Sequence, residues 1–256
     1  MTQQLFSLAG KKALVTGASR GIGQVIAVAF AEAGADVAVT ARGVEGLNET
    51  AKRIRDFGRE AAEIQADLNA QEVAAGVVAE AIDRLGRLDI VVNNAGGSNF
   101  VVPFLDMRMS GWEKVLRLNL DATMWICQAA GVHMTARGIG SIINVASAAG
   151  LAAAPFLAPY GAAKAAVVSL TKTLASEWGR TGVRVNALCP GWTATELNRG
   201  LWDTPDGGQA TIANVPMGRW ARPEEMAGPA VFLASEASSF MTGQVLTIDG
   251  GQTSTA

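Results

Sequence analysis

The sequence predicts an α/β fold in which helices cover both faces of one doubly wound, seven-stranded parallel sheet. Three observations predict it: short apolar strand-like segments alternate with helical ones from end to end, no internal repeat interrupts them, and 49% of the 256 residues are apolar. A chain of this length can bury one core and no linker divides it, so we expect a single domain over residues 1–256. The predicted strands are residues 13–16, 36–40, 60–65, 90–93, 141–145, 184–188 and 245–248, with helices between them.

The first predicted strand runs directly into a glycine-rich turn, Thr16 to Gly23, which an apolar helix follows. Gly17 permits a tight exit from the strand, Gly21 allows backbone to approach a pyrophosphate, and Gly23 allows close packing of helix on sheet. The first amides of the helix would then face the anion. The turn predicts a dinucleotide site in a Rossmann-type fold, and its other expected contacts are Ser19, Arg20 and Ile22.

The end of the second predicted strand indicates which nicotinamide cofactor binds. A site for NAD usually places Asp or Glu there to accept a hydrogen bond from the ribose 2′-hydroxyl, whereas an arginine suits a 2′-phosphate. Here Ala41 stands at the expected acidic position, Arg42 follows it, and Arg20 lies inside the glycine turn. Two guanidinium groups could clamp one phosphate, so we expect NADP(H), with NAD(H) disfavoured.

Three residues in the middle of the chain predict a proton-transfer site. Tyr160, the single tyrosine, and Lys164 stand four apart at the start of a helix, and Ser147 lies thirteen residues before Tyr160 at the end of the fifth strand. Side chains at i and i+4 share one helix face, so the ammonium can favour the ionised phenol. Lowering the pKa of a phenol from about 10 to 7 takes roughly 4 kcal/mol, which a desolvated site with a second positive charge could supply. Tyr160 would exchange the proton, and Ser147 would donate a hydrogen bond to the substrate oxygen.

Together these motifs resemble those of classical short-chain dehydrogenases/reductases over nearly the whole chain. The resemblance rests on Thr16–Gly23, Asp67-Leu68, Asn93–Gly96, Asn119, Ser147, Tyr160 with Lys164, and Pro190-Gly191. It implies that Asn119 completes a catalytic tetrad and positions a water, that Lys164 also holds the nicotinamide ribose beside Tyr160, and that Asp67 touches the adenine. The further cofactor contacts that we expect are Leu68, Asn94, Ala95, Gly96, Pro190, Gly191, Thr193 and Thr195.

Residues 192–220 predict a mobile lid over the substrate. The segment is rich in Trp, Leu and Gly, and its glycines Gly207 and Gly208 permit hinging. Trp192, Leu197, Leu201 and Trp202 could close an apolar wall over the reacting carbon, and residues 97–100 and Phe156 are further pocket candidates. Few of these residues are charged, so we expect a small-molecule substrate that is a hydrophobic ketone or secondary alcohol.

Charge, hydropathy and the content of Cys and His limit the classes of binding partner that we expect. The 21 basic and 23 acidic residues give a formal charge of −2 and are dispersed, which argues against a nucleic-acid groove. No N-terminal signal pattern and no run approaching about 18 apolar residues occurs, so we expect a cytoplasmic protein without membrane contact. Cys127 and Cys189 stand in apolar contexts, so we expect them to be buried free thiols. The lone His133 has no His or Cys cluster near it in the sequence, so we expect no metal.

The leading hypothesis is an NADP(H)-dependent carbonyl reductase or alcohol dehydrogenase. A 3-oxoacyl-[acyl-carrier-protein] reductase is the first alternative; it needs a basic patch beside the cleft, for which Arg137 and Arg180 form only a thin cluster. Sugar or polyol oxidation is a further alternative, which the apolar lid disfavours. A nucleotide-sensing regulatory protein should show a broken tetrad, and here the tetrad is whole.

The last segment, residues 241–251, resembles the final strand and glycine turn of the same family, whose members with this ending usually form tetramers. We therefore expect a homotetramer. The apolar helices at residues 124–132 and 163–174 would supply its faces, although the sequence allows them equally to be internal.

Overall fold

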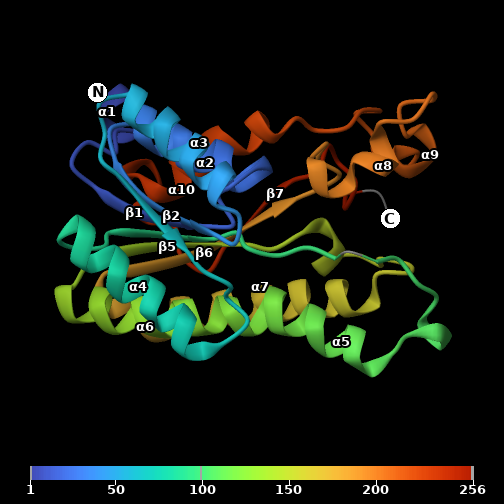
Figure 1. Ribbon diagram of the computed structural model, residues 1–256, viewed down its shortest axis with the longest axis horizontal. Coiled ribbons are helices and arrows are strands. Elements are labelled where there is room, and N and C mark those ends of the chain that lie inside the picture. The colour runs from blue at the N-terminus through green and yellow to red at the C-terminus, as the bar shows by residue number, and fades with distance from the viewer. Residues whose placement is uncertain (1, 99, 255–256) are drawn as a thin grey trace.

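The computed structural model describes residues 2–98 and 100–254, and these form the predicted three layers, with a central sheet between two sets of helices (Figure 1). Seven strands pair in parallel in the order β3-β2-β1-β4-β5-β6-β7. Their bounds are β1 Lys12–Thr16, β2 Asp36–Ala41, β3 Ala61–Gln65, β4 Ile90–Asn93, β5 Gly140–Val145, β6 Val183–Pro190 and β7 Val245–Ile248. The predicted strands and the doubly wound parallel sheet are therefore confirmed.

The longer helices divide between the two faces of the sheet (Figure 1). One face carries α2 Gly21–Glu32, α3 Val44–Asp56 and α10 Ala227–Ala234. The other carries α4 Gln71–Leu85, α5 Met109–Leu116, α6 Ala122–Arg137 and α7 Ala158–Trp178. The short helices are α1 Thr2–Leu5, α8 Arg199–Trp202 and α9 Gln209–Ile212. The 3₁₀ turns are η1 Phe104–Asp106, η3 Ala148–Gly150, η4 Gly179–Thr181, η5 Glu196–Asn198, η6 Pro223–Met226 and η7 Glu236–Ser238, and η2 Arg117–Asp121 is π-helical.

The apolar strands explain why both faces are covered. Successive strand residues point to opposite faces, so Val15 and Val39 join the core under α2 and α10, whereas Leu14 and Ala38 join the core under α4 and α6. Every residue of β4 and β5 is buried. Such strands need a helical layer on each side, and the helical crossovers between parallel strands supply both layers.

The order of the strands places the functional site. The first three strands follow one another from β1 to β3 toward one edge of the sheet, and β4 then pairs with the other side of β1. The connections after β1 and β4 therefore diverge at the carboxyl edge of the sheet, which is where open sheets of this kind bind ligands.

The two cysteines and the single histidine take different places in the fold, and Cys189 lies near the carboxyl end of β6. Cys127 and Cys189 are buried free thiols, as predicted. His133 accepts a hydrogen bond at Nε2 from the Leu88 amide at 3.2 Å. Over residues 2–98 and 100–254, no group of three or more His, Cys, Asp or Glu side chains is placed to hold a metal ion, and no helix has the length and hydropathy to cross a membrane.

Candidate active site

The glycine-rich turn connects β1 to α2 at the carboxyl edge of the sheet. Gly17 and Gly21 have φ values of 65° and 59°, in the left-handed region that favours glycine. A Cβ at Gly23 would stand 2.4 Å from Asn94 Nδ2. That same Nδ2 donates to the carbonyl oxygens of Thr16 at 2.9 Å and Gly17 at 3.1 Å. The Asn94 side chain therefore holds the turn in shape, and the absence of a side chain at Gly23 makes room for it.

The turn fits a phosphate group. Helix α2 begins at Gly21, and Arg20 before it is extended and makes no side-chain cap bond. The first amides of α2 thus receive no acceptor from a cap side chain, and the positive end of the helix dipole faces the same way. Segment 192–220 closes the other side, since Thr195 Cγ2 lies 3.5 Å from where a Gly21 Cβ would stand.

Helix α3 supports the turn from behind, which the sequence analysis missed. Thr50 Oγ1 donates to the Ala18 carbonyl oxygen at 2.8 Å and accepts from Gln24 Nε2 at 2.8 Å. A Cβ at Gly46 would stand 2.4 Å from the Ser19 carbonyl oxygen. Gly46 and Thr50 are four residues apart on one helix face, and that spacing was the signal available in the sequence.

The residues expected at the adenosine end lie at the ends of β2 and β3. Arg20 and Arg42 are both exposed, and Ala41 ends β2 without a carboxylate beside it. Asp67 is exposed and accepts from Asn69 Nδ2 at 2.6 Å. Leu68 is 5% exposed and its side chain packs in the core under α4, so only its backbone is available to a ligand.

Ser147, Tyr160 and Lys164 come together as predicted. The Ser147 hydroxyl lies close enough to the Tyr160 phenol to lower its pKa. Lys164 Nζ lies 5.7 Å from the centroid of the Tyr160 ring and donates to the Val145 carbonyl oxygen at 2.8 Å. Lys164 is only 3% exposed, so its ammonium is held at the base of the site by the end of β5.

The electrostatics of Tyr160 correct one expectation. Burial raises the pKa of the phenol, because it disfavours the phenolate, and the hydrogen bond from Ser147 acts in the opposite direction. Burial also lowers the pKa of Lys164 to about 8. The expectation of a lowered Tyr160 pKa therefore does not hold for the protein without cofactor, where desolvation outweighs the effect of Ser147; the lowering expected with a second positive charge from the nicotinamide stays a prediction. The phenol is neutral at pH 7, which is the form that donates a proton.

Asn119 lies beside these residues. It is fully buried in η2, where a π-helical turn joins α5 to α6. Its Oδ1 accepts from the Gly97 amide at 2.8 Å, and its Nδ2 donates to the carbonyl oxygens of Gly97 and Val115, both at 2.9 Å. A Cβ at Gly96 would stand 2.6 Å from Asn119 Oδ1 and 3.2 Å from Lys164 Nζ. Asn119 and Lys164 therefore both lie against Gly96, in the segment that follows β4.

The threonines beyond β6 lie against the same edge. Strand β6 runs to Pro190, two residues further than predicted, and the Gly191 amide donates to the Ile248 carbonyl oxygen at 2.9 Å. Thr193 is buried and donates from Oγ1 to the Gly191 carbonyl oxygen at 3.2 Å. Thr195 lies over Gly21 of the phosphate turn, whereas Thr193 is buried beneath it in the chain's return from β6.

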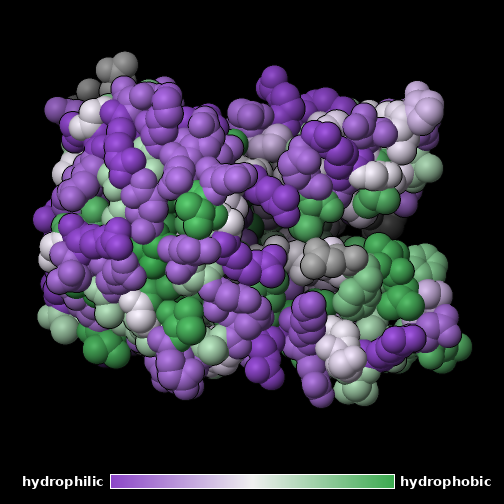
Figure 2. Space-filling model, in the orientation of Figure 1, coloured by the Kyte–Doolittle hydropathy of each residue, from purple (hydrophilic) through white to green (hydrophobic). Residues whose placement is uncertain are grey.

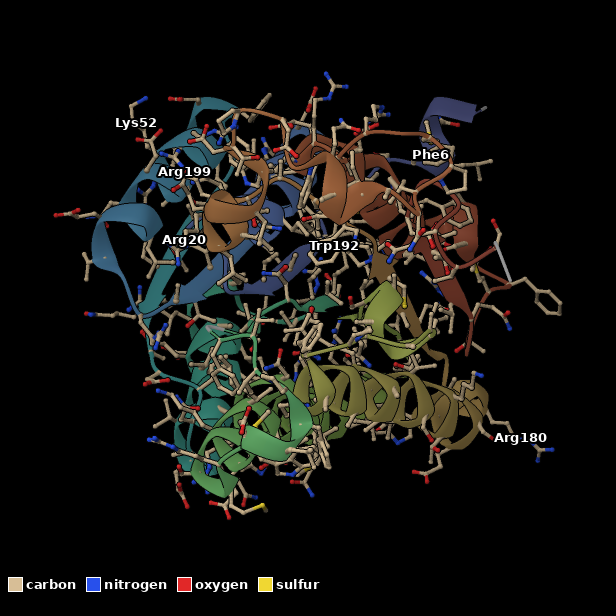
Figure 3. The ribbon with its side chains drawn as sticks, turned by 90° about the vertical axis from the view of Figure 1, so that its right-hand side faces the viewer. Phe6, Arg20, Lys52, Arg180, Trp192 and Arg199 are labelled. Carbon is tan, nitrogen blue, oxygen red and sulfur yellow. The ribbon has the colours of Figure 1, made fainter. Side chains whose placement is uncertain are left out.

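The apolar side chains of segment 192–220 form only part of the expected wall. Trp192 packs edge-on against Trp220, with ring centroids 5.5 Å apart, and lies on the face of the molecule that Figure 3 views. Trp202 donates from Nε1 to the Thr195 carbonyl oxygen at 2.9 Å. Leu197 packs against Gly97. Both predicted indoles thus hold the segment itself together, so their presence says little about how apolar the substrate is.

The remaining pocket candidates, residues 98–100 and Phe156, lie in the segments that precede α5 and α7. Phe156 has a φ of 67°, is 56% exposed, and accepts at its carbonyl oxygen from the Val102 amide at 3.0 Å. Ser98 Oγ donates to the Phe100 carbonyl oxygen, and Asn99 lies outside the described residues. Figure 2 shows a furrow that separates the region of α8 and α9 from the region of α5, which Figure 1 labels in the same orientation.

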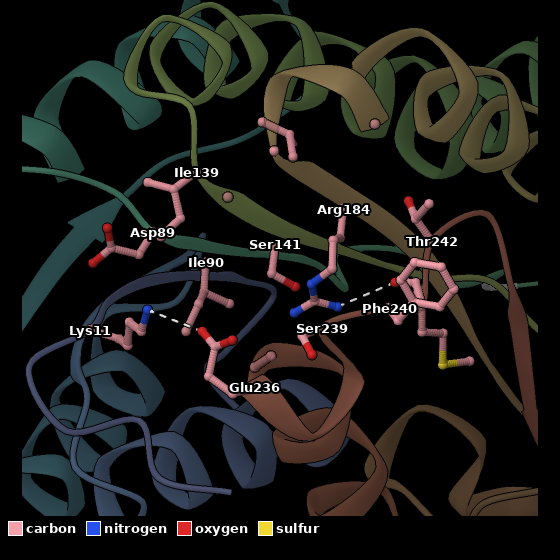
Figure 4. A pocket seen from close by; sticks show the side chains of 16 residues that line it. Lys11, Asp89, Ile90, Ile139, Ser141, Arg184, Glu236, Ser239, Phe240 and Thr242 are labelled. Carbon is pink, nitrogen blue, oxygen red and sulfur yellow. Dashed lines mark hydrogen bonds and ion pairs between the residues drawn. The ribbon is translucent and has the colours of Figure 1, made fainter. Parts of the chain in front are cut away.

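A hollow of about 490 Å³ lies elsewhere, at the amino ends of β5 and β6 (Figure 4). Lys11 and Glu236 form an ion pair across it at 3.8 Å, and Arg184 donates to the Met241 carbonyl oxygen. None of the predicted site residues lines this hollow. The chemistry at the carboxyl edge is therefore separate from it.

The chain is similar to known proteins over nearly its whole length. A protein-family model described as enoyl-(acyl carrier protein) reductase matches residues 17–253. A gluconate 5-dehydrogenase from Gluconobacter oxydans is 41% identical over 250 residues, 97% of each chain. A rhamnolipids biosynthesis 3-oxoacyl-[acyl-carrier-protein] reductase from Pseudomonas aeruginosa is 42% identical over 256 residues, 96% of this chain and 97% of the relative. The crystal structure of a gluconate 5-dehydrogenase from Burkholderia cenocepacia with NADP and tartrate has a TM-score of 0.94, 40% identity and full coverage of both chains.

Proposed function

Since the chain belongs to the classical short-chain dehydrogenase/reductase family, we propose that it is an NADP(H)-dependent oxidoreductase that interconverts a secondary alcohol and a ketone in a sugar acid or polyol. The observation that carries the proposal is that Lys164 lies beside the Tyr160 ring, next to Ser147, and that Lys164 and Asn119 both lie against Gly96. A purely regulatory protein should lack one or more of these four residues, whereas this chain has all of them.

The substrate class rests on the relatives. From the sequence alone, a hydrophobic ketone ranks first and sugar or polyol oxidation lower, because segment 192–220 is apolar. Relatives named gluconate 5-dehydrogenase support the lower-ranked class better. The structure removes the objection to it, since Trp192 and Trp202 make their contacts within the segment.

In the proposed mechanism, the neutral Tyr160 phenol gives its proton to the carbonyl oxygen during reduction and is left as the phenolate; during alcohol oxidation, the phenolate takes the hydroxyl proton. Ser147 is held against Tyr160 and donates a hydrogen bond to the same substrate oxygen, which stabilises the charge that develops there. Lys164 is buried with its ammonium fixed on Val145, where it offsets negative charge on the phenol. NADP, when bound, accepts or supplies the hydride.

The cofactor preference follows from the ends of β1 and β2. We propose that Arg20 and Arg42, both exposed and without a nearby β2 carboxylate, bind the 2′-phosphate, and the bound NADP of a relative supports this. Comparison of kcat/KM for the two cofactors tests the proposal. A preference of tenfold or more for NAD(H) would contradict it.

A substrate panel read by absorbance of the reduced cofactor tests the substrate class. It should contain gluconate and other sugar acids, linear polyols, hydrophobic ketones and 3-oxoacyl thioesters. We expect the highest kcat/KM for a sugar acid or polyol. A preference of tenfold or more for a hydrophobic ketone would return the substrate to the class that the sequence analysis favoured.

Reduction of 3-oxoacyl thioesters is a second candidate, because one relative of 42% identity carries that name. The basic residues named for docking a carrier protein are poorly placed for it. Arg137 pairs with the buried Asp89 at 3.0 Å at the amino edge of the sheet, and Arg180 follows α7 at the same edge. Both lie away from the carboxyl edge, where the substrate would enter.

We also propose that residues 192–220 act as a lid, that Thr193 and Thr195 contact the cofactor, and that the protein is a cytoplasmic homotetramer. Support for the lid comes from its contacts with Gly21 and Gly97 on two sides of the site. Solution mass tests the assembly: light scattering should give four times the 26.5-kDa chain. A monomer mass would contradict it.

A further inference from the structure

A set of hydrogen bonds centred on one side chain organises the start of the lid. Asn198 Oδ1 accepts from the Thr195 amide at 2.9 Å and from Thr195 Oγ1 at 3.0 Å. Asn198 Nδ2 donates to the Thr193 carbonyl oxygen at 2.9 Å. One carboxamide thus ties together residues 193–198, which we call the Asn198 loop.

The Asn198 loop touches both sides of the candidate site. On one side, the Thr195 methyl group lies over Gly21 of the phosphate turn. On the other, Leu197 Cδ2 lies 2.7 Å from where a Gly97 Cβ would stand. Gly97 is itself bonded through its amide and its carbonyl oxygen to Asn119. The loop therefore spans from the phosphate turn to the buried asparagine of the tetrad.

We propose that Asn198 is a positioning residue for the cofactor. It touches neither substrate nor cofactor; instead it holds Thr193 and Thr195 in the orientation in which they close over a bound dinucleotide. This inference rests on the proposed function for its ligand. Glycine at position 97 permits the close approach of Leu197, and a carboxamide is needed because the loop requires an acceptor and a donor on one short side chain.

Asn198→Ala removes all three side-chain bonds and tests the inference. We expect the Kd of NADPH, measured by its fluorescence, to rise about tenfold, the factor that 1.4 kcal/mol of lost binding free energy produces. The KM for NADP should rise by a similar factor, with a smaller change in kcat at saturating cofactor. Amide hydrogen exchange in the protein without cofactor should increase across residues 193–198.

Two further variants make the result specific. Asn198→Asp keeps the acceptor for Thr195 and loses the donor to Thr193, so its Kd and exchange should fall between those of wild type and Asn198→Ala. Gln209→Ala alters an exposed residue of α9 in the same lid and should leave both quantities unchanged. Unchanged thermal unfolding would show that each variant is folded.

The outcomes separate this inference from the proposed function. Wild-type affinity for NADPH in Asn198→Ala would overturn the inference, whether or not exchange in the loop increases. Failure of the wild-type protein to bind NADPH or NADH would overturn the proposed function itself. Increased exchange together with weakened NADPH binding supports the inference.

Discussion

Gly96→Ala adds one methyl group at the point where the tetrad residues meet. That Cβ would stand 2.6 Å from Asn119 Oδ1 and 3.2 Å from Lys164 Nζ. The φ of Gly96 lies outside the left-handed region, so the backbone itself tolerates alanine. Three hydrogen bonds to Gly97 and Val115 hold the Asn119 side chain, so moving it costs hydrogen-bond energy.

The size of the effect follows from these contacts. Inserting a methyl group into a packed site costs about 1–3 kcal/mol. If Asn119 instead gives up one of its bonds, the cost is about 1 kcal/mol for the bond and more for a polar atom left unpaired. We therefore expect the free energy of unfolding to fall by about 2 kcal/mol, or about 4–8 °C in Tm for a chain of this size. A shift of about 1 Å in the catalytic groups can lower kcat by about 100-fold.

Calorimetry and steady-state kinetics measure the two effects. Gly76→Ala is the matched control: Gly76 lies within α4, and no atom lies within 4 Å of where its Cβ would stand. Alanine there should leave kcat unchanged and stabilise the protein by up to about 1 kcal/mol. If Gly96→Ala kept wild-type kcat and Tm, the convergence of Asn119 and Lys164 on this glycine would be refuted.

Other predictions concern charge. Burial lowers the Lys164 pKa to about 8, so the folded state loses this proton at a lower pH than the unfolded state does. Between pH 8 and 10, the free energy of unfolding of wild type, measured by denaturant titration, should therefore rise by a few kcal/mol relative to that of Lys164→Met. The same dependence on pH in both proteins would contradict this. Burial lowers the His133 pKa, so the unfolded state binds this proton first as the pH falls below about 6.5. Protonation also removes the acceptor for the Leu88 amide. The free energy of unfolding of wild type should therefore fall relative to that of His133→Gln over this range. Arg42→Ala should raise the KM for NADP at least about tenfold and leave that for NAD nearly unchanged, because only the 2′-phosphate would lose its charge partner; equal effects on both would exclude the proposed clamp.

The sheet could be predicted because its signals are local. Strands buried on both faces are short apolar runs, and the turn at Gly17 and Gly21 needs positive φ, which the sequence shows as glycine. Strand β6 extends to Pro190 because Pro190 pairs with Ile248 of β7, more than fifty residues away. That pairing leaves no mark in the sequence around Pro190.

The site could be predicted in its residues but only partly in its energetics. Tyr160 and Lys164 share a helix face, so their meeting followed from spacing alone. The pKa of Tyr160 is set by burial, which depends on elements that spacing does not describe. The π-helical turn at Asn119 depends on bonds to Gly97, and the role of Trp202 depends on a bond to Thr195. Each of these is a tertiary contact, and none has a local pattern.

Proton transfer by Tyr160 is the central claim, and Tyr160→Phe tests it most directly, because it keeps the ring and removes the proton. The measurement is kcat for the best substrate of the panel, with the Kd of NADPH determined on the same preparation. We predict that kcat falls by at least about 100-fold while the Kd of NADPH stays within the wild-type range. Near-normal turnover by Tyr160→Phe would contradict the account.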